Sequence, residues 1–143
     1  MLHTHSRIWI HLVWATHNRE PCLDTEKSKQ LFDFMIDKGK QEGFPFEKLF
    51  IRPEDVHALI DLPTNKTLSA IMQVIKGSSS YWLNENLFRS HFSWQRGYGA
   101  YSVSASKLER VKTYIANQDI HHRKTTFTEE YNKWRKEYGV FED

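Results

Sequence analysis

Hydrophobic and polar positions along this chain form alternating strand-like and helix-like stretches. A nearly continuous apolar run over residues 7–16 predicts a central strand, because both of its faces are apolar. Residues 46–52 and 56–62 predict two further strands, and the short Pro53-Glu54 connection between them predicts an antiparallel hairpin. Residues 92–104, which combine aromatic residues with glycines, predict a fourth strand.

Helical patterns lie between these strands. A first helix is predicted from a cap at Asp24 or Thr25 to Gly43, since a glycine can end it. A second helix is predicted from a cap at Thr67 and runs on past Gly77. Both carry apolar residues at intervals of three and four, which is the pattern of a helix with one buried face.

Two more helices are predicted towards the C-terminus. Each begins with a capping box, in which a Ser or Thr is followed three residues later by Glu: Ser106 with Glu109, and Thr126 with Glu129. The second of these places three aromatic residues at helical spacing, which are Tyr131, Trp134 and Tyr138.

The order strand, helix, strand, strand, helix, strand is that of the split β-α-β arrangement. We therefore expect one α+β domain over residues 1–143, a ferredoxin-like (RRM-like) antiparallel sheet with helices on one face, plus the C-terminal helices. The other face of the sheet is expected to be free. Asp55 and His57 are expected to lie side by side on that free face.

Composition limits the classes of protein that this chain can be. Hydrophobic residues make up 39% and charged residues 27%, which is typical of a globular protein. No apolar run approaches the ~18 residues of a membrane span, and the N-terminus shows no signal pattern, so we expect a soluble, cytoplasmic protein without a membrane partner. A net charge of +2 permits a nucleic-acid partner without requiring one.

The strand 56–62 and the turn before it carry the first candidate chemistry. Side chains alternate across a sheet, so Asp55 and His57 share one surface while Val56 and Ala58 point to the core. A carboxylate and an imidazole placed together can share a divalent cation. The pattern is equally that of an ordinary strand with one polar face, so these two residues alone leave both interpretations open.

Tyr114 and Gln118 are four residues apart on the third predicted helix. That spacing places a phenol and an amide on one helix face. Packing for the tyrosine and solvation for the glutamine explain the same pattern, so helical periodicity does not decide between a site and a surface.

Other residues are candidates for contacts with nucleic acid. Lys76 and the serines that follow it place a charge and hydroxyls near a helix break, where either phosphate or water could be their partner. Aromatic and basic residues interleave between Trp94 and Tyr101 and could stack on unpaired bases or pack in the core. A basic patch follows the third helix. The candidate DNA-binding residues are Lys76, Ser78, Ser79, Arg96, Tyr98, Arg123 and Lys124.

Over nearly its whole length the chain resembles the single-tyrosine transposases of insertion sequences in the HUH superfamily, including the REP-associated tyrosine transposases. The resemblance rests on five motifs in order: Ile-His-Leu-Val-Trp-Ala-Thr-His-Asn-Arg-Glu-Pro, Glu-Asp-Val-His-Ala-Leu-Ile-Asp-Leu, Lys-Gly-Ser-Ser-Ser, Trp-Gln-Arg-Gly-Tyr-Gly-Ala-Tyr-Ser-Val-Ser, and Tyr-Ile-Ala-Asn-Gln followed by His-His-Arg-Lys. It implies a metal-dependent enzyme that cuts and rejoins single-stranded DNA through a 5′-phosphotyrosine, with hairpin ends as substrates.

The resemblance also assigns roles to residues. It makes Tyr114 the nucleophile, and it makes His57 and Gln118 ligands of Mg²⁺ or Mn²⁺. The first histidine of the family's His-hydrophobic-His strand is replaced here by Asp55, a hard oxygen ligand that suits Mg²⁺. It further implies a homodimer, because family members act as dimers in which one subunit often presents its tyrosine helix to the other.

A second hypothesis comes from a different class of protein. The ferredoxin-like topology is shared with RNA-recognition domains, so the chain could be a catalytically silent nucleic-acid-binding module, for example a domesticated transposase. The added negative charge of Asp55 would repel a phosphate and favours this alternative. Tyr114 and Gln118 would have no task in such a module, which favours the enzyme.

Overall fold

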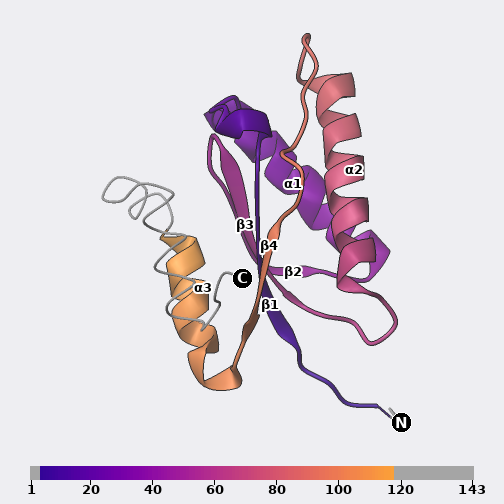
Figure 1. Ribbon diagram of the computed structural model, residues 1–143, viewed down its shortest axis with the longest axis vertical. Coiled ribbons are helices and arrows are strands. Elements are labelled where there is room, and N and C mark those ends of the chain that lie inside the picture. The colour runs from indigo at the N-terminus through magenta and orange to yellow at the C-terminus, as the bar shows by residue number, and fades with distance from the viewer. Residues whose placement is uncertain (1–3, 118–143) are drawn as a thin grey trace.

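The computed structural model describes residues 4–117, which form a four-stranded antiparallel sheet with helices on both of its faces (Figure 1). The strands lie in the order β2-β3-β1-β4, as the ferredoxin-like prediction requires. The elements are β1 (Trp9–Ala15), a 3₁₀ turn (His17–Arg19), α1 (Thr25–Glu42), β2 (Phe46–Ile51), β3 (Asp55–Asp61), α2 (Leu68–Asn86), β4 (Gly99–Val103), a second 3₁₀ turn (Ala105–Lys107) and α3 (Leu108–Ala116).

The predicted hairpin is present. The backbone N–H of Arg52 donates to the carbonyl of Asp55 at 2.8 Å, which closes a tight turn between β2 and β3. β1 lies in the middle of the sheet, where His11 is opposite Leu59 of β3 and Tyr101 of β4. Because β1 is hydrogen-bonded on both sides, its central residues 10–14 are buried, while Trp9 and Ala15 at its ends are partly buried.

The first face of the sheet packs against α1 and α2. Asp24 caps α1 by accepting from the backbone N–H of Lys27 at 2.9 Å, and Gly43 ends the helix with a φ of 82°, a conformation that glycine adopts without strain. Thr67 caps α2 in the same way, through the N–H of Ala70. Alternate residues of β3, including Val56, point into this core, as predicted.

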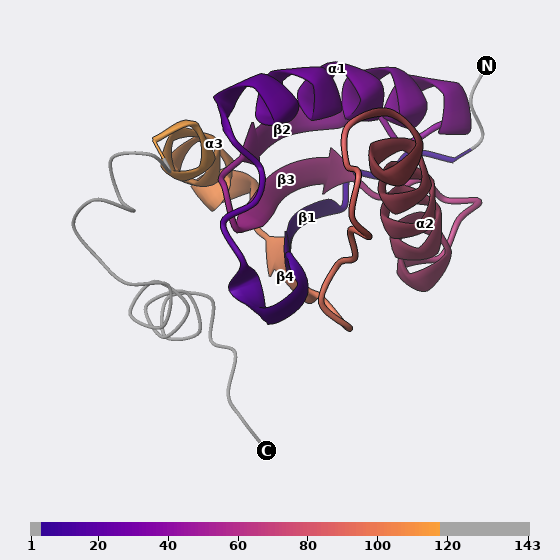
Figure 2. The same ribbon diagram turned by 90° about the horizontal axis from the view of Figure 1, so that it is seen from above.

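The second face packs against α3, so it is not free as expected, whereas the predicted ferredoxin-like sheet with two helices on one face and a further C-terminal helix is confirmed. α1 and α2 lie on one side of the sheet and α3 on the other (Figure 2). Val111 and Ile115 of α3 pack against Leu59 and Val103, so the apolar stripe of this helix finds its partners on the second face. The last described helix therefore closes the face that carries Asp55.

Two local predictions were wrong. The fourth strand begins at Gly99, because the chain before it leaves the sheet after an isolated bridge between Trp94 and Thr16, next to the end of β1. Ser106 does not cap α3: it lies within the second 3₁₀ turn, and its hydroxyl bonds that of Ser104 at 3.1 Å. The predicted helix at Thr126 falls outside the described residues. Among residues 4–117, the helices are too short or too polar to cross a membrane.

Candidate active site

β3 places Asp55 and His57 next to each other beneath α3. The alternation of the strand brings both side chains to the second face, as predicted, and His57 Nε2 lies 3.5 Å from Asp55 Oδ1. Both side chains are fully buried, which corrects the prediction that they are exposed. They are therefore part of a closed polar cluster between the sheet and the helix.

Two arginines hold the Asp55 carboxylate. The Arg19 Nη2 group donates to Oδ2 at 2.7 Å, and Arg52 Nε lies 3.0 Å from Oδ1. Arg52 also donates from Nη2 to Glu54 Oε1 at 2.8 Å. Each oxygen of the buried carboxylate thus faces a guanidinium, and two carboxylates and two guanidiniums are formally neutral together. We call these four residues the Asp55 ion-pair cluster.

Burial and the neighbouring charges have opposite effects on the pKa of Asp55. Burial raises the pKa of this carboxyl, but the adjacent His57 and the positive charges of Arg52 and Arg19 outweigh that effect. The pKa is therefore held below its usual value. Asp55 is therefore a charged carboxylate at neutral pH, not a neutral acid.

Tyr114 of α3 lies over the same region of the sheet. Its ring centroid is 6.5 Å from that of His57 and 6.3 Å from that of His11, and its hydroxyl oxygen is buried. The helix-borne tyrosine and the strand-borne histidine that the resemblance selected are thus brought together within one chain. The two residues are more than fifty positions apart in the chain, so helical or strand periodicity alone could not connect them.

His11 is a member of this cluster that the sequence did not identify. It is fully buried on β1, and its ring centroid is 5.7 Å from that of His57. Burial lowers the pKa of His11 well below its usual value, and the nearby His57 adds to the effect, so the imidazole is neutral at neutral pH. A single polar residue inside the apolar run 7–16 was the available signal for it.

The donor set can be compared with the needs of a divalent metal ion. Two neighbouring ligands of an octahedral ion at about 2.1 Å are separated by about 3 Å. The 3.5 Å between Asp55 and His57 is close to that spacing, and their oxygen and nitrogen donors suit Mg²⁺ or Mn²⁺. Within residues 4–117 there is no cluster of three His, Cys, Asp or Glu residues that could hold a metal. The described pair fits two positions of such an ion, and further ligands would come from water or from Gln118, which lies outside the described residues.

The candidate DNA-binding residues on α2 have other partners. Ser79 is fully buried, and its hydroxyl donates to the carbonyl of Ile75 at 2.6 Å and accepts from the indole N–H of Trp94 at 2.9 Å. Ser78 donates to the carbonyl of Val74 at 2.6 Å. The hydroxyls of these serines are therefore satisfied within the fold, and their binding of phosphate stays a prediction.

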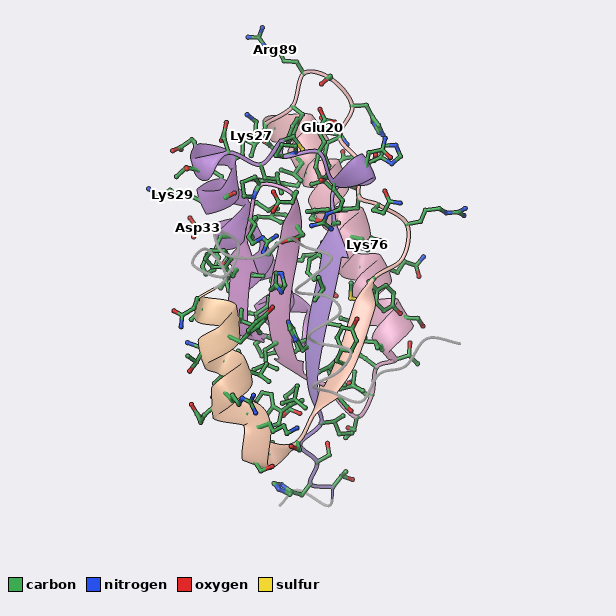
Figure 3. The ribbon with its side chains drawn as sticks, turned by 60° about the vertical axis from the view of Figure 1, so that its left-hand side comes forward. Glu20, Lys27, Lys29, Asp33, Lys76 and Arg89 are labelled. Atoms are coloured by element: carbon green, nitrogen blue, oxygen red, sulfur yellow. The ribbon has the colours of Figure 1, made fainter. Side chains whose placement is uncertain are left out.

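Lys76 anchors the segment that leads into β4. Its Nζ donates to the carbonyls of Gln95 and Gly97, both at 2.8 Å, and the side chain lies between α2 and that segment (Figure 3). Partial burial lowers the pKa of this amine. Lys76 thus shapes the surface that carries Arg96 and Tyr98.

Arg96 and Tyr98 lie at the surface as predicted. Tyr98 is 41% exposed, and both residues line a cavity of about 490 Å³ between the end of β1 and the segment before β4. Arg19 lines the same cavity, so the cavity lies next to the Asp55 ion-pair cluster. Trp94 and Tyr101 are buried and pack in the fold. Arg123 and Lys124 lie outside the described residues.

We expect Lys76→Met to loosen the segment before β4. Removal of the ammonium leaves two carbonyls without their donor, so amide hydrogen exchange over residues 95–99 should become several-fold faster while α1 keeps its protection. Lys38→Met is the matched control, because it breaks only a surface pair with Glu42 on α1. Equal exchange rates at 95–99 in both variants would contradict this role of Lys76.

Comparisons with known proteins identify the family of this chain and support its fold. The family model described as "Transposase IS200 like" matches residues 4–118. The ISDra2 transposase TnpA of Deinococcus radiodurans is 24% identical over 115 residues, which cover 76% of this chain and 81% of that protein.

Solved structures show the same fold. A protein assigned as a transposase from Deinococcus radiodurans R1 superposes with a TM-score of 0.67 at 23% identity, over 82% of this chain and 95% of that one. A REP-associated tyrosine transposase bound to a REP hairpin gives a TM-score of 0.62 at 17% identity, over 85% of this chain and 74% of that one.

The four-stranded antiparallel sheet with helices on both faces defines the class: an α+β domain with the fold of the REP-associated tyrosine transposase. The match of the family model to residues 4–118 makes the assignment specific. The chain belongs to the IS200-like family of transposases.

Proposed function

We propose that this protein cuts and rejoins single-stranded DNA, with Tyr114 as the nucleophile. The observation that carries the proposal is the position of Tyr114 on α3, within 6.5 Å of His57 by ring centroids and over the strand that carries Asp55. Family membership supports DNA cleavage and rejoining as the class of reaction.

In the proposed step the Tyr114 oxygen forms a bond to the phosphorus, and the bond from phosphorus to the 3′ oxygen breaks. The downstream fragment stays attached to the protein through its 5′ phosphate as a phosphotyrosine, and the upstream fragment leaves with a 3′-hydroxyl after its 3′ oxygen takes up a proton. The tyrosine gives up one proton in exchange. The neutral imidazole of His11, with its ring centroid 6.3 Å from that of Tyr114, is a candidate to accept it.

Asp55 and His57, with Gln118 by resemblance, would hold Mg²⁺ or Mn²⁺. When bound, such an ion polarises the scissile phosphate and stabilises its developing charge. The two described ligands are fixed by β3, and Arg52 orients the carboxylate of Asp55 from the adjoining turn. The protein's own contribution is thus a rigid, buried pair of donors beside the tyrosine.

The surface around Arg96 and Tyr98 is the proposed path of the DNA strand. The cavity beside it has room for an unpaired base, an exposed ring can stack on that base, and the guanidinium can pair with a phosphate. The relative bound to a REP hairpin supports a hairpin as the folded substrate. By resemblance, Arg123 and Lys124 would add contacts to the DNA backbone.

The test is covalent capture of DNA. The full chain is incubated with labelled hairpin and single-stranded oligonucleotides, with Mg²⁺, with Mn²⁺ or with a chelator, and is separated on a denaturing gel. The proposal expects a labelled protein band that depends on the metal. Absence of that band under every metal, together with tight hairpin binding, would retire the enzyme in favour of the silent DNA-binding module.

One observation favours the second candidate function, the silent DNA-binding module. Both oxygens of Asp55 face guanidiniums, so the carboxylate has already found positive partners inside the protein. A cluster that is neutral by itself can persist as a structural element in a protein that only binds DNA. The metal dependence of the adduct separates the two functions.

We further propose that the protein assembles as a homodimer, on the resemblance alone. In the structure Tyr114 and His57 of the same chain are neighbours, so a dimer is not needed to bring these two side chains together. Light scattering at micromolar concentration should give twice the 17.1 kDa of one chain. A mass of one chain only would contradict the dimer and leave the proposed chemistry intact.

A further inference from the structure

Arg19 occupies a position between two different environments. On one side its guanidinium donates to the buried carboxylate of Asp55 at 2.7 Å, and on the other it lines the cavity that Arg96 and Tyr98 share. Its side chain is 31% exposed, whereas that of Asp55 is fully buried. A rotation of this one side chain can therefore move a positive charge from the buried cluster to the proposed DNA path.

The backbone that carries Arg19 is held in place. Asn18 and Arg19 have φ values of 54° and 55°, and two consecutive residues other than glycine in this left-handed region are uncommon. The N–H of Asn18 donates to Gln95 Oε1 at 3.0 Å, and the N–H of Arg19 donates to the carbonyl of Thr16 at 2.9 Å. The turn thus fixes where the guanidinium starts, and only the side chain is left to move.

Arg52, the other partner of Asp55, is more deeply buried than Arg19. Its side chain is 2% exposed, and Glu54 accepts from both its Nη2 and its Nε groups. If a divalent cation enters beside Asp55 and His57, positive charge accumulates in a buried place unless one guanidinium moves away. Arg19 is the guanidinium that borders the cavity, so it has the shorter way out of the buried cluster.

We propose that Arg19 is an exchangeable counter-ion. It pairs with Asp55 in the metal-free protein, is displaced from Asp55 when a divalent cation binds there, and then pairs with a DNA phosphate in the cavity lined by Arg96 and Tyr98. The inference rests on the proposed metal and DNA binding of this site and adds to it a specific coupling. Metal binding and DNA binding then strengthen each other, because both favour the conformation in which Arg19 points away from Asp55.

The first experiment measures metal affinity without DNA. Mn²⁺ is titrated calorimetrically into the full chain as wild type, Arg19→Gln, Arg19→Lys and Arg7→Gln. Removal of the competing charge in Arg19→Gln should tighten Mn²⁺ binding by roughly tenfold, within the usual range of coupling between two sites. Arg19→Lys, which keeps the charge, should stay close to the wild type.

Arg7→Gln is the matched control. Arg7 also pairs with an aspartate of β3, at 2.8 Å from Asp61, but that pair lies at the surface and outside the Asp55 ion-pair cluster. Its removal should leave the Mn²⁺ affinity unchanged. Equal or weaker Mn²⁺ binding in Arg19→Gln relative to the wild type would overturn the proposal, and so would a lack of Mn²⁺ binding in all four proteins.

Thermal unfolding distinguishes the proposed exchange from a purely structural role of Arg19. Without metal, Arg19→Gln should melt below the wild type, because Asp55 has lost a partner. Saturating Mn²⁺ should raise the melting temperature of Arg19→Gln by more than that of the wild type, since tighter binding stabilises more. Equal shifts in both proteins would count against the exchange.

The coupling itself is tested with Tyr114→Phe as the background, so that DNA is bound and not cut. Mn²⁺ should tighten the binding of a single-stranded hairpin several-fold in this background and should have little effect once Arg19→Gln is added. Unchanged coupling in the double variant would overturn the second half of the proposal.

The outcomes separate this inference from the proposed function. Tighter Mn²⁺ binding by Arg19→Gln without any covalent adduct in the wild type would uphold the exchange and retire the nuclease. A metal-dependent adduct with unchanged Mn²⁺ affinity in Arg19→Gln would uphold the nuclease and overturn the exchange.

Discussion

Tyr114→Phe should abolish the covalent protein–DNA adduct while the protein still binds hairpin DNA. The substitution removes the one oxygen that would attack phosphorus and keeps the ring that packs between α3 and the sheet. Loss of a nucleophile that acts within a fixed site lowers the rate by about a thousandfold or more. The loss of one hydroxyl from the fold should cost about 1 kcal/mol of unfolding free energy, which leaves a folded protein to measure.

If the adduct persists in Tyr114→Phe, the structure indicates which other tyrosine is the better candidate nucleophile. Tyr101 of β4 is buried, with its ring centroid 6.3 Å from that of His11, so it belongs to the same face of the sheet. Tyr98 is exposed on the cavity, away from the buried histidines. Tyr98→Phe is therefore the matched control and should keep the adduct, and an adduct in Tyr114→Phe would direct attention to Tyr101.

The elements of the fold could be predicted because local rules specify them. The Pro53-Glu54 turn is too short for anything but a hairpin, and the alternation of the strand after it assigns Val56 and His57 to opposite faces. Caps at Asp24 and Thr67 fix where α1 and α2 begin. Each of these signals acts over a few residues, so a single sequence contains it.

The burial of the site could not be predicted in the same way. The stripe of α3 formed by Val111 and Ile115 requires an apolar partner, but periodicity does not say which surface supplies it. Leu59 and Val103 are that partner, and both lie on the face that had been expected to stay free. An apolar leucine between His57 and Asp61 was the only local hint that this face is covered.

The cluster around Asp55 is non-local as well. Arg19 follows β1 and Asp55 begins β3, so their contact depends on the pairing of Ala15 with Asp55 across the sheet. His11 joins the same face through the register of β1. The resemblance suggested Tyr114 and His57, but the quoted motifs do not show that Arg19 and Arg52 meet at Asp55, because that contact depends on the tertiary structure.

Asp55→Ala should destabilise the protein by about 3–5 kcal/mol, which is the usual effect of removing one partner of a buried ion pair. The variant removes one carboxylate partner from the buried guanidinium of Arg52 and breaks the ion pair of Arg19 with Asp55. Urea unfolding followed by circular dichroism measures the change. Asp55→His should also lose stability, since an imidazole cannot neutralise two guanidiniums, even though it restores the nitrogen ligand of the family and favours Mn²⁺.

Asp61→Ala is the control for Asp55→Ala, because Asp61 lies on the same strand and pairs with an arginine, Arg7, at the surface. That loss should stay below about 1 kcal/mol. In the double variant Asp55→Ala/Arg19→Gln, the second change should cost less than it does alone, since the ion pair is already broken. Equal losses for Asp55→Ala and Asp61→Ala, or strictly additive effects at Asp55 and Arg19, would show that the buried cluster does not hold this part of the fold together.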